Sequence, residues 1–347
     1  MKFMFFVANQ FLPHESYTTK IQECVEQVRI ARDAGFDMVS MGQHFLAVPY
    51  QMPQPVPFAA RLAAETGDML VGITIFLLPL LNPVQVAEEV ATLDGITGGR
   101  FVFGAGLGYR EEEYASFRVE VKERVPRMME ALEVIKRLWT EDEVEFQGRF
   151  YTVPRVKVYT RPVQKPHPPI WIAANSDSAV ARVGSVGASW IINPHATVTT
   201  VERQLQLYHQ ARSEAGHPMP AYLPMLREVF VDEDRDRAWK EAAPYVGEKY
   251  ATYAAWGQDK VMPGQESFHV ALQSLAKDRF IIGTPEDFVR EVQRYEERLG
   301  VNMIGLRMQW PGMAHEKVLR QLELFKTRII PEFRRLRPRD DAPHVRS

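Results

Sequence analysis

The stretch that decides the fold reads LVGITIFL at residues 70–77, NPVQVAEEVATLD at residues 82–94 and FVFGA at residues 101–105. The first and third segments are short, apolar and rich in β-branched and aromatic residues, as buried strands are. The middle segment has apolar residues at helical spacing, and Asn82-Pro83 places a capping side chain before a proline in the first helical position. A strand, a helix and a second strand in this order predict a parallel βαβ unit.

The same alternation continues from end to end of the 347-residue chain. Strand-like runs lie near residues 3–8, 37–42, 70–77, 101–105, 170–174, 190–193, 223–231 and 302–308. Helical runs follow them near residues 17–34, 57–67, 83–95, 122–140, 177–187, 199–215, 285–299 and 315–330. Eight such units predict an α/β protein with one (β/α)8 TIM barrel over residues 1–332, because barrels of this size commonly form a single domain. Residues 333–347 show no periodicity and are expected to form a flexible tail.

Three segments are longer than the minimal unit requires: about residues 106–122, 141–169 and 239–279. Within the second, VEFQGRFY at residues 144–151 predicts a small hairpin. Loops that follow barrel strands build the active-site face, so we expect these insertions to cover a pocket.

Composition excludes several classes of protein. The net charge of −2 and the absence of a basic stripe argue against nucleic-acid binding. Cys24 is the only cysteine, which rules out an intrachain disulfide and a cysteine-based metal cluster. The apolar run Met1–Val7 is too short for a signal peptide or a membrane span. We therefore expect a cytoplasmic protein that does not enter a membrane.

The signatures of several enzyme classes are missing. The chain has no HExxH metal motif and no GxSxG nucleophile motif, so we expect neither a metal site nor a serine nucleophile. GAGLG at residues 104–108 follows a strand, but YREEE at residues 109–113 places acid where a dinucleotide pyrophosphate would bind. Gly106 and its neighbouring glycines are better explained as positions where backbone comes close to a flat ligand or makes a tight turn.

Some polar residues lie where the predicted strands end. His44, preceded by Gln43, comes just after the second strand, at the barrel end where catalytic groups collect. The segment Asn175-Ser176-Asp177-Ser178 separates the fifth strand from a helix, which predicts a helix cap and, compatibly, an anion-binding site. Arg307, near the end of the last strand, either binds an anionic ligand group or pairs with a carboxylate inside the barrel.

A set of short motifs covers about residues 1–332 in a characteristic order. They are AGFD (34–37), GQHF (42–45), ATLD (91–94), GGRF (98–101), RPVQ (161–164), PHPPIW (166–171), SWIIN (189–193) and GTPE (283–286). In this order and spacing the chain resembles the bacterial luciferase-like family of flavin-dependent oxidoreductases.

The resemblance implies a barrel that binds FMN at its C-terminal mouth. Thr74-Ile75 would lie under the isoalloxazine, where relatives often have a cis peptide bond. Ser176, with its neighbours Asn175, Asp177 and Ser178, would hold the phosphate. Trp190 would form a wall of the flavin site, and Gly106 would lie close to it.

The resemblance further implies a two-component monooxygenase, in which reduced FMN comes from a separate flavin reductase and oxygen is used to oxidise a small organic substrate. The candidate catalytic residues are His44 and Gln43. Candidate walls of the substrate pocket are Phe45, Tyr109 and Trp310, with Arg307. The family also implies a homodimer.

Two departures separate the chain from the luciferases. Gln43 stands where they have the first of two consecutive histidines, and Leu107 stands where they have an arginine near the phosphate. These differences argue against light emission. Two alternatives stay open: hydride transfer with a deazaflavin on the same barrel, and a non-catalytic flavin-binding protein.

Overall fold

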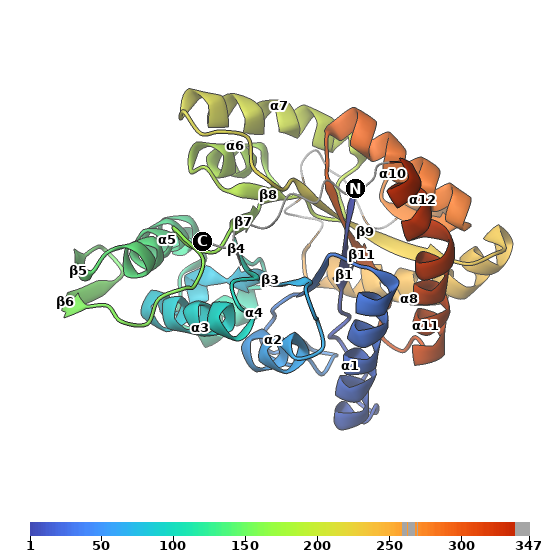
Figure 1. The fold of residues 1–347 in the computed structure, drawn as a ribbon, viewed down its shortest axis with the longest axis horizontal. Helices are drawn as coiled ribbons and strands as arrows, with labels where there is room; N and C mark the ends of the chain where they lie inside the picture. Colours follow the sequence, from blue (N-terminus) through green and yellow to red (C-terminus); the bar gives the residue numbers. More distant parts are fainter. Residues whose placement is uncertain (259–261, 263–267, 269, 337–347) are drawn as a thin grey trace.

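The computed structural model describes residues 1–258, 262, 268 and 270–336 of the chain. Its centre is a curled sheet of nine parallel strands with helices packed on its outer face (Figure 1). In spatial order the strands are β10 (Phe280–Gly283), β9 (Pro224–Val231), β11 (Met303–Arg307), β1 (Lys2–Phe6), β2 (Met38–Met41), β3 (Leu70–Leu77), β4 (Phe101–Gly106), β7 (Ile170–Ala173) and β8 (Ser189–Ile191). The α/β class with a parallel sheet is therefore confirmed.

The larger helices alternate with the strands, as the hydrophobic pattern predicts. They are α1 (Tyr17–Ala34), α2 (Pro55–Ala63), α3 (Pro83–Ile96), α5 (Arg124–Thr140), α6 (Asp177–Ser185), α7 (Val198–Glu214), α8 (Arg235–Ala255), α10 (Pro285–Leu299), α11 (His315–Leu324) and α12 (Ile330–Leu336). Shorter turns of helix are α4 (Glu111–Ser116), α9 (Leu272–Ala276), η1 (Leu78–Leu80), η2 (Val121–Glu123) and the π-helical η4 (Phe325–Ile329).

The hydrogen-bonded order of the sheet ends at β8 on one side and at β10 on the other, so a closed eight-stranded barrel is not confirmed. One isolated bridge joins the two sides. The amide of Ile192 donates to the carbonyl of Pro224, and the amide of Leu226 donates to the carbonyl of Ile192, both at 2.9 Å. Beyond this bridge, β9 pairs with β10, a strand that the sequence analysis did not predict.

The capping residues occupy the positions that the sequence predicts. The Asn82 side chain accepts a hydrogen bond from the amide of Val84 at 2.9 Å. Thr284 and Asp287 form a reciprocal capping box at the start of α10. Gly35, which ends α1, has a φ of 94°, the left-handed conformation that favours glycine at a helix end.

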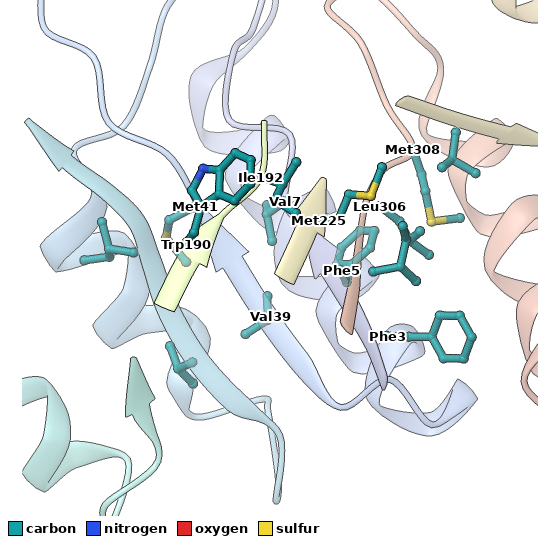
Figure 2. Close-up of a cluster of buried hydrophobic side chains, with 14 of the residues drawn as sticks. Phe3, Phe5, Val7, Val39, Met41, Trp190, Ile192, Met225, Leu306 and Met308 are labelled. Carbon is teal, nitrogen blue, oxygen red and sulfur yellow. The ribbon is translucent and has the colours of Figure 1, made fainter. Parts of the chain in front are cut away.

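Alternation along the strands divides the core into two parts. Phe3, Phe5 and Val7 point toward the helices and join a large outer cluster, part of which is drawn in Figure 2. Met4 and Phe6, which alternate with them, point toward the inside of the curl and join a smaller inner cluster. Successive side chains of a strand face opposite sides of its sheet, so every second residue of a strand is available to an interior site.

The three predicted insertions differ in structure. Residues 106–122 contain α4 and lead into η2. The hairpin of β5 (Glu143–Gln147) and β6 (Thr152–Lys157) confirms the predicted one and projects away from the sheet (Figure 1). The third insertion contains part of α8 and α9, and some of its residues lie outside the described ones.

The expected boundary at residue 332 falls inside α12. Phe333 is buried and packs edge-on against Phe3, with ring centroids 5.2 Å apart. Residues 333–336 therefore belong to the folded domain, while the rest of the predicted tail, residues 337–347, lies outside the described residues.

Candidate functional site

A cavity of about 470 Å³ opens where the parallel strands end. Its lining comes from the C-terminal halves of β1, β3, β7, β8 and β11, from the loops that follow β1, β2, β4, β7, β8 and β11, and from Leu226 in β9. Ligand sites of parallel α/β proteins gather at this end of the strands. The cavity is therefore the candidate functional site.

The inserted segments contribute unequally to this cavity. Leu107, Gly108 and Tyr109 line it from the first insertion, and Lys249, Tyr253, Gln258 and Met262 line it from the third. Residues 141–169 do not line it, because their hairpin extends away from the strand ends. The expectation that all three insertions cover the pocket is wrong for this second one.

His44 faces the cavity and is held from behind by a buried carboxylate. Its Nδ1 lies 3.0 Å from Oε1 of Glu113, and the amide of Phe45 donates to the same oxygen at 2.8 Å. The Glu113 side chain is fully buried on α4, and the Arg110 guanidinium lies 3.8 Å away. Because the carboxylate accepts, Nδ1 carries a proton, which leaves Nε2 for a ligand.

Gln43 also lines the cavity, but protein groups engage both ends of its side-chain amide. Its Oε1 accepts from the amide of Leu77 at 2.9 Å, and its Nε2 donates to Oε1 of Gln54 at 3.3 Å. These bonds fix the end of β3 against the loop after β2. The structure thus holds the Gln43 side chain in place at the cavity edge.

Thr74 and Ile75 form part of the cavity wall on β3. The peptide bond between them is cis, as the family resemblance implies. Both residues face the cavity even though they are consecutive, because the register of β3 against β4 shifts between Ile73 and Phe76. Gly106 does not line the cavity; a Cβ on it would lie 2.0 Å from Cδ1 of Ile75, so it leaves room for that side chain.

At the N-terminus of α6, two of the four predicted residues line the cavity: Asn175 and Ser176. The Ser176 hydroxyl caps the helix by accepting from the amide of Ala179 at 3.4 Å. Asp177 instead points to α7, where Arg203 and Gln204 bond its carboxylate and hold its pKa below the usual value.

Ser178 lies beside Ser176, with their hydroxyl oxygens 3.4 Å apart, but does not line the cavity. Arg124, which the sequence analysis missed, does line it. Burial raises the pKa of Tyr114, and the nearby Arg124 guanidinium partly offsets this rise. The Tyr114 hydroxyl donates to the carbonyl of Leu107. Arg124, which lies near Tyr114, therefore places a cation close to Leu107, the residue that stands where the luciferases have an arginine.

Three predicted pocket residues do not line the cavity. Trp190 is fully buried in the outer cluster (Figure 2), and its Nε1 donates to the carbonyl of Ala174 at 3.0 Å. Trp310 lies in the same cluster, and Phe45 packs against Phe117 with ring centroids 4.5 Å apart. Strand alternation explains the first case, because the neighbouring Ile191 takes the inward position.

Tyr109 lies against His44, with ring centroids 5.7 Å apart, and lines the cavity as predicted from the sequence. Its buried hydroxyl has no hydrogen-bond partner among the described residues. Burial raises the pKa of this hydroxyl well above its ordinary value. A neutral donor next to His44 is therefore available to a bound ligand.

A buried charged group lies where β9, β11 and α8 meet. Oε1 of Glu228 is 2.5 Å from Nζ of Lys249 and 3.8 Å from Nη1 of Arg307. Oε2 of Glu228 accepts from Nε1 of Trp310 at 2.6 Å. Of the two roles that the sequence left open for Arg307, both stay possible, because it lies near a carboxylate and also lines the cavity.

Burial sets the protonation of the neighbouring bases. It lowers the pKa of Lys249 to about 8, although the Glu228 carboxylate favours the charged form. Burial and the nearby cations, Arg307 first among them, hold the pKa of His195 well below its ordinary value. His195 is therefore neutral at pH 7, with its Nδ1 3.0 Å from the Tyr250 hydroxyl.

Across residues 1–258, 262, 268 and 270–336 no cluster of three or more histidine, cysteine or acidic side chains could hold a metal ion. Nor is any helix in these ranges both long and apolar enough to cross a membrane.

Comparison with known proteins places this arrangement in context. The family model described as luciferase-like monooxygenase matches residues 1–302. The chain is 25% identical to the F420-dependent glucose-6-phosphate dehydrogenase of Amycolatopsis mediterranei, with 91% of this chain and 95% of the relative covered. It is 24% identical to the alkanal monooxygenase alpha chain of Photorhabdus laumondii, with 95% and 97% covered.

Two solved structures share the fold. The monooxygenase RslO1 of Streptomyces bottropensis superposes with a TM-score of 0.85 at 23% identity, covering 96% of this chain and 100% of that one. The oxygenating constituent of 3,6-diketocamphane monooxygenase of Pseudomonas putida, in complex with FMN, gives a TM-score of 0.83 at 17% identity, covering 96% and 99%.

Proposed function

Because the chain belongs to the luciferase-like monooxygenase family, we propose that it is a flavin-dependent monooxygenase that uses reduced FMN and oxygen to oxidise a small organic substrate. The observation that carries the proposal is the cavity at the strand ends, which joins an anion-binding end at Ser176 and Arg124 to the ring of His44. Reduced flavin, when bound, supplies the chemistry that activates oxygen.

The residues present fit an FMN molecule. At one end of the cavity, the capped N-terminus of α6, the Ser176 hydroxyl and the Arg124 guanidinium suit a phosphate. The wall formed by Thr74 and Ile75 suits a flat ring system. Arg124 would supply the positive charge that the luciferases have at the position of Leu107.

The chain's own groups would then handle the substrate. His44, with its proton on Nδ1 directed to Glu113, would present Nε2 as a general base, or as a general acid once protonated. The neutral Tyr109 hydroxyl would donate a hydrogen bond nearby. The apolar residues of the lining, among them Leu77, Leu107 and Met262, would exclude water.

The decisive experiment is an anaerobic titration of the protein with reduced FMN and with a reduced deazaflavin, followed by mixing with oxygen. Tight binding of reduced FMN, with hydrogen peroxide released far more slowly than from free reduced FMN, supports the monooxygenase. Preference for the deazaflavin, with no reaction with oxygen, favours the second candidate. Flavin binding without turnover on a broad substrate panel favours a non-catalytic flavin-binding protein.

The second candidate function is hydride transfer with a deazaflavin. It is favoured by the relative named F420-dependent glucose-6-phosphate dehydrogenase, which covers nearly the same share of the chain as the alkanal monooxygenase. The two functions predict opposite dependence on oxygen, so the titration separates them.

Arg124→Met is expected to weaken FMN binding by about tenfold or more, because a charge-assisted hydrogen bond contributes roughly 1.5–3 kcal/mol. Ser176→Ala should weaken it by a smaller factor, since it removes one neutral donor. Fluorescence titration gives both dissociation constants. The matched control is Arg298→Met, which removes an exposed cation paired with Glu202 away from the cavity. Equal FMN affinity in Arg124→Met and the wild type would contradict this assignment of the phosphate end.

The proposal includes three further parts. We propose that the sheet functions as a closed (β/α)8 barrel through the Ile192–Met225 bridge. A separate reductase would supply reduced FMN, which a coupled assay with a purified flavin reductase would test. The protein would form a homodimer in the cytoplasm, and a stable monomer in light scattering would refute the dimer.

A further inference from the structure

The described part of the cavity lining carries three positively charged side chains, Arg124, Lys249 and Arg307, and no carboxylate. Arg124 lies on the side of the cavity that is formed by the end of β4 and the N-terminus of α6, where the phosphate of FMN is proposed to bind. Lys249 and Arg307 belong to the side of β9 and β11. Since β1, β2 and β3 separate β11 from β4 in the sheet, the two positive regions lie on opposite sides of the cavity.

The second region has more positive than negative charge. One oxygen of Glu228 serves both cations, at 2.5 Å from Lys249 and 3.8 Å from Arg307, while the other oxygen accepts from Trp310. Among the described residues, the remaining titratable groups that face this region are Tyr250 and Tyr253 on α8, His195, Arg227 and Arg279; burial keeps the tyrosines protonated and the histidine neutral. None of these described groups adds negative charge, so Lys249 and Arg307 share the single carboxylate of Glu228.

Arg307 carries the excess charge into the cavity. Its Nε is buried and has no hydrogen-bond partner in the part of the chain that the structure describes. Its guanidinium lies over the ring of Phe6, 4.5 Å from the centroid, which restricts where the group can lie. The planar fork of a guanidinium matches a planar, two-oxygen ligand.

We propose that Arg307 binds a carboxylate of the substrate, across the cavity from the cofactor phosphate. The identity of this anion as substrate rests on the proposed function. A carboxylate is preferred to a phosphate because Lys249 and Arg307 exceed Glu228 by one charge and the guanidinium offers a planar fork. Lys249 takes part indirectly: by neutralising Glu228 it frees Arg307 for the ligand.

The test is calorimetric titration of the FMN-loaded protein with phenylacetate, phenylacetamide and phenyl phosphate. We expect phenylacetate to bind tighter than phenylacetamide, and Arg307→Met to weaken phenylacetate binding by at least about tenfold. Arg307→Lys should restore part of this loss, because the charge returns without the fork. Arg298→Met, which removes an exposed cation paired with Glu202 on the outer surface, is the control and should leave all three affinities unchanged.

A second variant tests the charge argument without touching Arg307. In Lys249→Met, Glu228 has Arg307 as its only cation within 4 Å among the described residues, so phenylacetate affinity should fall although the arginine is present. In the wild type the affinity should fall as the pH rises through about 8, because Lys249 loses its proton there. Circular dichroism establishes that each variant is folded before it is titrated.

Equal affinities for the acid and the amide would overturn the proposal, as would tighter binding of phenyl phosphate than of phenylacetate. It would also be overturned if Arg307→Met weakened FMN binding and left phenylacetate binding unchanged, since Arg307 would then serve the cofactor. The titration needs no turnover. If the protein prefers the acid but its reduced flavin never reacts with oxygen, the anion site is supported and the monooxygenase proposal is contradicted. If the protein turns over but does not prefer the acid, the monooxygenase proposal is supported and the anion site is contradicted.

Discussion

His44→Asn is expected to lower kcat with reduced FMN and oxygen by about 100- to 10,000-fold, the range that a positioned acid or base contributes. The imidazole has one nitrogen directed at Glu113 and the other at the cavity, while asparagine offers a shorter side chain that does not titrate near neutrality. The FMN dissociation constant should change little, because the proposed phosphate end lies at Ser176 and Arg124. Turnover is measured at saturating oxygen with a fixed concentration of reduced FMN.

The exposed His14→Asn is the matched control, since it removes a surface imidazole that does not line the cavity. Glu113→Gln should reduce kcat by less than His44→Asn and shift its pH profile, because an amide oxygen still accepts from Nδ1 without the charge. Full turnover in His44→Asn would remove this residue from the mechanism.

Glu228→Gln is expected to lower the free energy of unfolding by about 3–5 kcal/mol, because it leaves buried cations without their carboxylate. The amide is nearly isosteric and can still accept from Trp310, so the loss reports charge rather than packing. Urea unfolding at pH 7 measures it. The double variant Glu228→Gln/Lys249→Met removes both members of the 2.5 Å pair and should be more stable than the single variant.

The pH dependence supplies a second readout of the same pair. The pKa of Lys249 is about 8 in the folded protein and 10.5 as its ordinary value, so the unfolded chain binds this proton more tightly. Stability from this group therefore rises with pH between about 8 and 10.5. In Glu228→Gln the loss should shrink as the pH rises, because a neutral Lys249 needs no partner. A loss independent of both pH and Lys249 would contradict the ion-pair explanation.

Much of the fold could be predicted from the sequence, because hydrophobic periodicity and helix caps are local signals. The segment 70–105 indicates a strand, a helix and a strand, and the structure has β3, α3 and β4 there. β10 was missed because its four residues, Phe280–Gly283, follow a long segment without clear periodicity. Sheet closure was not predictable in detail, since the single bridge at Ile192 depends on how far the sheet curls.

The candidate site was only partly predictable. His44 and Ser176 follow strands directly, so their position in the sequence brings them to the cavity. Trp190 and Trp310 are also near strand ends, but the direction of a side chain depends on register, and Ile191 and Gln309 take the inward positions beside them. Lys249 comes from a helix within an insertion, where no short-range pattern indicates which turn faces the cavity.

His195 could have been found by the rule that selected His44. It lies four residues after the last residue of β8, in the loop that enters the cavity. Arg124 had no such signal, because it begins a helix, and only the packing of α4 brings it near Tyr114.

The bridge between Ile192 and Met225 has a thermodynamic consequence for any ligand of the cavity. On one side of this bridge, Ile192 is followed directly by the lining residues Asn193, Pro194 and His195. Leu226 lies on the other side, so the cavity wall includes residues from both sides of the bridge. A ligand that contacts both sides binds only when the bridge is formed, and it therefore stabilises the bridged form by its own binding free energy. By reciprocity, a substitution that destabilises the bridge weakens ligand binding by the same factor. Amide exchange at Ile192 and Leu226 is where this coupling would be read.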